Sequence, residues 1–92
     1  MPTTFNDNLK RMKRLSDLRP GQRGIIHSFE KDEIFIKLME MGCVPGEKVQ
    51  VEQVAALGDP ISISVSGYVL SLRLSEASAI FIEEEPQQPD NQ

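Results

Sequence analysis

The residues of this sequence that could do chemistry are few: one histidine, His27, one cysteine, Cys43, and scattered carboxylates. Histidine and cysteine are common ligands of zinc and iron, and Glu30 or Glu40 could complete such a site. No pair of these residues has the short, regular spacing of metal-binding motifs. The sequence therefore favours a surface histidine and a small, partly buried apolar cysteine, with metal binding by His27 and Cys43 as the alternative.

Catalytic constellations are equally scarce. A serine–histidine–acid arrangement could use only His27, and no nucleophile motif surrounds any serine. The glycines at 21 and 24 lack the lysine and the serine or threonine of a phosphate-binding loop. We therefore expect a protein that is not an enzyme and has no cofactor.

Length and charge narrow the remaining classes of protein and partner. Ninety-two residues suffice for one small domain, and a single cysteine forms no internal disulfide. Residues 1–24 carry a net charge of +4 and residues 25–92 a net charge of −8. An acidic body repels phosphate backbones, and one tyrosine is few for stacking on bases, so nucleic acid is disfavoured as a partner. No apolar run is long enough to span a membrane and no signal peptide is recognisable, so we expect a cytoplasmic protein.

The elements that must position these residues follow from a change of apolar period near the middle of the chain. Residues 24–29 predict a strand, and apolar residues at three- and four-residue spacing predict a helix over 32–41, with Asp32 as its N-cap and Gly42 as its left-handed end. Pro45-Gly46 fits a type II turn. Alternating residues then predict strands at 49–52, 61–65, 68–74 and 79–82, with one helical turn at 75–77.

The predicted folded part runs from residue 15 to residue 84. Residues 1–14 form a basic extension, expected to be a solvated arm or a contact for anionic lipid, and residues 85–92 an acidic, disordered tail. Short strands with close turns predict a small, strongly bent antiparallel β-barrel, whose closure would remove exposed edges. An open α+β sandwich fits the periodicity nearly as well.

Five points marked by glycine or proline fall in an order that resembles a known family. They lie in L-x-x-L-x-P-G at 15–21, L-x-E-x-G-x-x-P-G at 38–46, L-G-D-P-I at 57–61 and G-Y-V-L-S-L-R at 67–73. This order resembles the ferrous iron transport protein A (FeoA) family over nearly all of the predicted folded part. The same domain is similar to the C-terminal module of iron- and manganese-dependent repressors, but the chain shows no helix-turn-helix or metal-sensing region.

The resemblance implies a mostly β, SH3-like barrel with one inserted α-helix. It also implies a small cytosolic accessory protein that binds FeoB, a membrane protein with a GTPase domain that carries ferrous iron inward. Such a protein would be peripheral to the membrane through its partner and would modulate assembly, GTP turnover or gating. The alternative is a metal-responsive adaptor that binds iron through His27, Cys43 and carboxylates.

For the partner contact we expect an apolar surface beside the helix and the turns. The candidates are Met39 in the helix, Val44 after it, Leu57 in the turn before Gly58, and Tyr68 just after a glycine. Met41 is expected in the core, whereas Met39 fits the core and the surface equally well. The oligomeric state stays open, because an SH3-like barrel can also dimerise through an edge strand.

Overall fold

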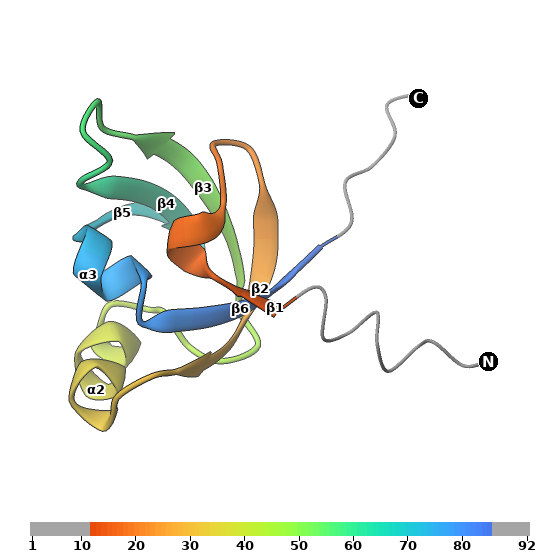
Figure 1. Ribbon diagram of the computed structural model, residues 1–92. Coiled ribbons are helices and arrows are strands. Elements are labelled where there is room, and N and C mark those ends of the chain that lie inside the picture. Colours follow the sequence, from red (N-terminus) through yellow and green to blue (C-terminus); the bar gives the residue numbers. More distant parts are fainter. Residues whose placement is uncertain (1–11, 86–92) are drawn as a thin grey trace.

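The computed structural model describes residues 12–85, which form one antiparallel sheet with short helices packed around it (Figure 1). The strands are β1 (Met12–Arg14), β2 (Arg23–Phe29), β3 (Lys48–Val54), β4 (Ile61–Val65), β5 (Tyr68–Leu72) and β6 (Ile80–Glu84). The helices are η1 (Leu15–Asp17), α2 (Asp32–Glu40) and α3 (Leu74–Ala77). The strand order is β1-β6-β2-β3-β4-β5.

The core follows the period of two that the sequence predicts. On β4, Ile61, Ile63 and Val65 are buried and the intervening serines are only half-buried. Branched side chains of this kind pack well on a pleated surface. One contiguous cluster results, made of Leu15, Leu18, Ile26, Leu38, Cys43, Val49, Val51, Ile61, Ile63, Val65, Leu72, Ala77, Ile80 and Ile82. The mostly β, antiparallel class is confirmed.

The sheet bends strongly but its edges stay open. The register shifts between Ile26 and Ser28 on β2 and between Val51 and Gln53 on β3, and such bulges increase local twist. Within residues 12–85 the strand order ends at β1 and β5, which do not pair with each other. The expectation that closure removes the edges is therefore wrong. The short helix η1 packs against β6 and α3.

The folded part begins earlier than predicted, because residues 12–14 form β1 against β6. Lys13 Nζ lies 2.9 Å from Glu84 Oε1. The Arg14 guanidinium donates to Glu30 Oε1 at 2.8 Å and lies over the Phe81 ring at 4.9 Å from its centroid. The last part of the basic extension is therefore held by acidic and aromatic groups of the sheet. The rest of both predicted terminal segments, 1–11 and 86–92, lies outside the described residues.

The other boundaries differ by small steps. The last strand extends to Glu84 rather than Ile82, and the Glu85 N–H continues the pairing by donating to the Arg23 carbonyl at 3.0 Å. Lys31, not Asp32, is the N-cap of α2, because Lys31 keeps an extended backbone and the helix already includes Asp32. Asp32 and Glu33 still place negative charge in the first turn, at the positive end of the helix dipole.

The predicted end of α2 is confirmed in detail. Gly42 has a φ of +100°, its N–H donates to the Met39 carbonyl at 3.0 Å, and the Cys43 N–H donates to the Leu38 carbonyl at 2.9 Å. These two bonds make a Schellman motif, which satisfies carbonyls that the helix itself leaves free. Pro45-Gly46 then turns the chain, with a φ of +94° at Gly46 and a bond from the Glu47 N–H to the Val44 carbonyl.

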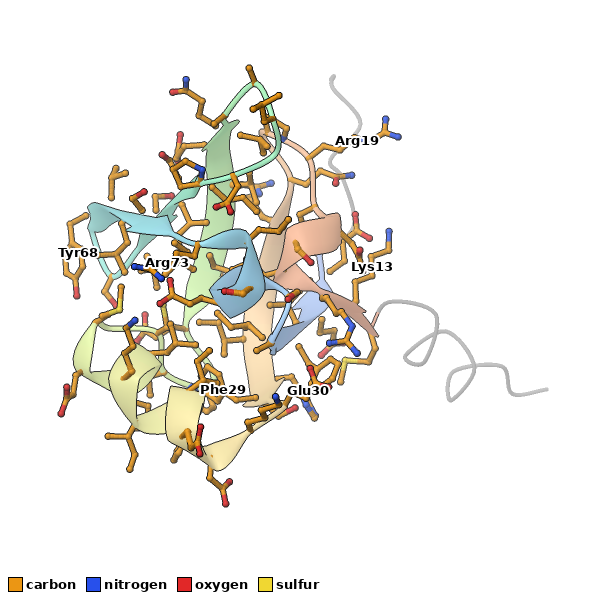
Figure 2. All side chains as sticks on the ribbon, turned by 60° about the vertical axis from the view of Figure 1, so that its left-hand side comes forward. Lys13, Arg19, Phe29, Glu30, Tyr68 and Arg73 are labelled. Atoms are coloured by element: carbon orange, nitrogen blue, oxygen red, sulfur yellow. The ribbon has the colours of Figure 1, made fainter. Side chains whose placement is uncertain are left out.

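A second tight turn brings β5 to the end of α2. Val65 pairs with Tyr68 across a two-residue loop, and both loop residues, Ser66 and Gly67, have positive φ, as a type I′ hairpin requires. The Tyr68 hydroxyl donates to the Met41 carbonyl at 3.0 Å. Figure 2 shows the Tyr68 side chain directed from β5 towards α2. The hairpin and the helix end are thus fixed to each other.

Two glycine substitutions test this junction. An added Cβ at Gly42 would overlap the Tyr68 hydroxyl, whereas one at Gly46 would meet nothing within 4 Å, although both positions have positive φ. We expect Gly46→Ala to lower the free energy of unfolding by about 1 kcal/mol, and Gly42→Ala to lower it by roughly 1–3 kcal/mol more. Urea unfolding measures both. In a Tyr68→Phe background the additional loss of unfolding free energy in Gly42→Ala should shrink. Equal losses of unfolding free energy in the two alanine variants would contradict this account.

Candidate docking surface

Three of the four predicted contact residues lie at the C-terminal end of α2. Met39 is in the last helical turn and 37% exposed, and Val44 is half-buried just after the Schellman motif. Tyr68 reaches the same place from β5 and is 48% exposed. We call Met39, Val44 and Tyr68 the helix-end surface. Residues far apart in the sequence meet here because the α2 end and the β4–β5 turn are bonded together.

Leu57 lies elsewhere. It belongs to the β3–β4 loop, which enters β4 at Ile61, whereas Tyr68 pairs with Val65 at the other end of the same strand. The two ends of β4, Ile61 and Val65, are about 13 Å apart along the strand. Figure 1 shows this loop and α2 at opposite ends of the molecule. Leu57 is 95% exposed and so forms a separate apolar projection.

Among residues 12–85, three further exposed large apolar side chains were not predicted: Ile36 and Val69, each 63% exposed, and Leu74, 40% exposed. Ile36 could have been found from the helical period, since at 100° per residue it lies opposite the buried Leu38 side and next to Met39. Leu74 follows Leu70 and Leu72 in the two-residue alternation of β5, but the chain enters α3 at that point. Tertiary structure therefore decides its exposure.

The structure does not bring the two metal-ligand candidates into one cluster. His27 is exposed on β2, with Nδ1 2.9 Å from the Ser28 hydroxyl, whereas Cys43 is completely buried. Of their proposed companions, Glu30 is paired with Arg14 and Glu40 is exposed. Between residues 12 and 85 no three histidine, cysteine or acidic side chains are grouped so that they could hold a metal ion.

A buried carboxylate that sequence reasoning missed lies beside Cys43. Glu76 on α3 is 6% exposed; its Oε2 lies 2.5 Å from Lys37 Nζ, and its Oε1 accepts the Arg73 N–H at 2.8 Å. The bond from Lys37 is the main reason why the pKa of Glu76 is lowered, against the opposing effect of burial. Burial, with a smaller effect of the Glu76 charge, raises the pKa of the Cys43 thiol to about 11. At neutral pH Cys43 is therefore a protonated, apolar core residue.

Comparison with known proteins identifies the family of this chain. The family model described as the FeoA domain matches residues 13–84. The chain belongs to the FeoA domain family. The predicted resemblance is confirmed, and this family is one of non-catalytic accessory domains, so the expectation of a protein that is not an enzyme is also confirmed.

Individual relatives agree with this assignment. A fusion protein of Fe(2+) transport protein A and Fe(2+) transporter FeoB from Porphyromonas gingivalis is 38% identical over 71 residues, which are 76% of this chain and 8% of the fusion protein. The solution structure of a FeoA-like protein from Clostridium acetobutylicum has a TM-score of 0.79 at 29% identity and covers 88% of this chain and 95% of its own.

Two further structures confirm the SH3-like fold. FeoA from Stenotrophomonas maltophilia, described as a prokaryotic SH3 domain protein and solved with zinc, has a TM-score of 0.68 at 27% identity, covering 79% of this chain and 95% of its own. A manganese-dependent transcriptional repressor shares the fold alone, with a TM-score of 0.73 at 16% identity over 80% of this chain and 42% of its own. In residues 12–85 no helix is long and apolar enough to cross a membrane.

The Glu76 carboxylate gives a pH-dependent prediction. Its folded pKa lies below the ordinary value of about 4.3, so its contribution to stability is complete above that pH and is lost as the pH falls through the folded pKa. We expect Glu76→Gln to lower the free energy of unfolding by about 1–2 kcal/mol at pH 7. In thermal or urea unfolding the difference should begin to shrink as the pH falls below the ordinary pKa of about 4.3 and vanish once the pH is below the lowered folded pKa. Glu40→Gln, at an exposed position, is the control, and a constant Glu76→Gln loss down to pH 3 would contradict the assignment.

Proposed function

We propose that this protein is an accessory subunit of ferrous iron uptake that binds the cytosolic side of a FeoB-type transporter and modulates it. The observation that carries the proposal is the fused relative, in which a region similar to this chain is covalently joined to FeoB. Fusion keeps two partners at a high effective concentration, and separate chains with the same relationship must replace the linker with a binding surface. The Stenotrophomonas protein, described as a possible ferrous iron transport activating factor, supports a modulating role.

The helix-end surface is the best candidate for that binding surface. Met39 and Tyr68 expose apolar area over a rigid base, because the Schellman motif and the Tyr68 bond to Met41 hold their backbones. A preorganised apolar surface loses little conformational entropy when a partner covers it. Leu57 is exposed on a loop, so ordering it would cost more.

The basic end of the chain supports docking by apolar contact rather than by attraction to anionic lipid. Lys13 and Arg14, two of the four basic residues between 10 and 14, are occupied by Glu84 and Glu30. Figure 2 shows Lys13 and Glu30 on the side of the molecule away from Tyr68. The positive charge of these two side chains is therefore largely compensated within the fold.

Binding to the purified cytosolic domain of the transporter tests the proposal. We expect Met39→Asp to weaken binding by at least about tenfold, because a buried unpaired charge costs several kcal/mol in an apolar contact. Tyr68 is left unchanged in this series, because any substitution there, Phe included, removes the hydroxyl that bonds to α2. Leu57→Asp should have a smaller effect, and Gln53→Asp, which adds the same charge at an exposed polar position, should have none.

Calorimetry or biolayer interferometry provides the affinities, and circular dichroism checks that each variant is folded. Loss of binding in Leu57→Asp with full binding in Met39→Asp would move the contact to the β3–β4 loop. No measurable binding of the wild-type chain to the cytosolic domain, with and without GTP, would overturn the proposed function.

A further inference from the structure

The two edges of the sheet differ in how they are protected. β1 is three residues long and carries Lys13 and Arg14. β5 is five residues long, has no charged residue and no proline, and pairs with β4 without a bulge. Proteins normally protect edge strands by shortness, charge, proline or bulges. β5 uses none of these, so it is the edge at which another strand can be added.

The backbone groups available on β5 follow from its register. Tyr68 closes the two-residue hairpin with Val65, so Tyr68, Leu70 and Leu72 direct their N–H and C=O groups towards β4. The groups of Val69 and Ser71 therefore point the other way. Among residues 12–85 neither Val69 nor Ser71 makes a further backbone or side-chain hydrogen bond, and both residues are exposed, Val69 by 63%.

We propose that β5 pairs with β5 of a second copy of this chain, antiparallel and about a two-fold axis at Leu70. In this register Val69 of each copy lies opposite Ser71 of the other. Each of these two pairs can exchange both N–H···O=C bonds, which gives four new hydrogen bonds from two short strands. An isologous contact needs a self-complementary edge, and an uncharged strand brings no like charges together.

Charged residues beyond the ends of β5 are also complementary between the two copies. The same register places Arg73 of one copy opposite Gly67 of the other, beside Ser66, whose hydroxyl is 3.2 Å from Glu47 Oε1. Arg73 and Glu47 are both exposed, and within residues 12–85 neither forms an ion pair. Pairing would therefore bring Arg73 of each copy close to Glu47 of the other. This match favours a second copy over an unrelated strand.

The contact is small. Five residues of strand bury less than the ~1,200 Å² of a stable complex, so we expect a weak dimer with a dissociation constant of roughly hundreds of micromolar. Such a dimer would respond to local concentration.

Sedimentation equilibrium of the complete chain, from micromolar to millimolar concentration, tests the inference without any transporter. Wild-type protein should show a concentration-dependent dimer. Val69→Lys and Ser71→Pro should stay monomeric: the first adds an edge charge, and the second removes an N–H that β4 does not use. Ile36→Lys is the matched control, because Ile36 is also 63% exposed but lies on α2, and it should dimerise like the wild type.

Charge reversal gives an independent readout. Arg73→Glu and Glu47→Arg should each weaken the dimer, and the double variant should restore it, even if either change alone alters stability. A wild-type chain that is monomeric at millimolar concentration, or a dimer that persists in both Val69→Lys and Ser71→Pro, overturns the proposal. A monomer whose binding to the transporter domain is lost in those two variants would assign the edge to the transporter instead.

Discussion

The bonds that satisfy the C-terminal carbonyls of α2 hold the rest of the structure in place. The left-handed backbone at Gly42 reverses the chain and sends Cys43 into the core, while Met39, one turn earlier, stays on the surface. The Tyr68 hydroxyl satisfies a further carbonyl, that of Met41, and so joins the β4–β5 hairpin to the helix. Together with the bond between Lys37 and Glu76 on α3, this fixes a short helix that could not be stable alone.

The ion pairs of this structure fix where segments of the chain lie more than they add to the free energy of unfolding. The basic start of the chain meets the acidic sheet through Lys13 with Glu84 and Arg14 with Glu30, and all four side chains are partly exposed. Pairs of this kind contribute at most about 1 kcal/mol each. Burial of Leu15 and the backbone pairing of β1 with β6 supply more. Glu76 is the exception, because it is almost fully buried and its charge depends on Lys37 and the Arg73 N–H.

A non-catalytic accessory domain acts through what it leaves uncovered, and two such features meet at β5. The side chain of Tyr68 belongs to the helix-end surface, and the strand that it begins forms the open edge of the sheet. The proposed transporter contact uses the side chains of this region, whereas the proposed strand pairing uses its backbone. The buried Cys43 and the exposed His27 belong to neither of these features.

The sequence by itself determined the local structure. Period-two alternation predicted the strands, and Gly42 and Pro45-Gly46 predicted the turns, because these patterns depend only on neighbouring residues. It also marked Met39, Val44 and Tyr68 as surface candidates. Only the tertiary structure decided that those three meet while Leu57 does not, that Arg14 and Lys13 complete a strand, and that Glu76 is buried beside Cys43. These outcomes depend on contacts between residues far apart in the chain, for which a single sequence carries no period or spacing signal.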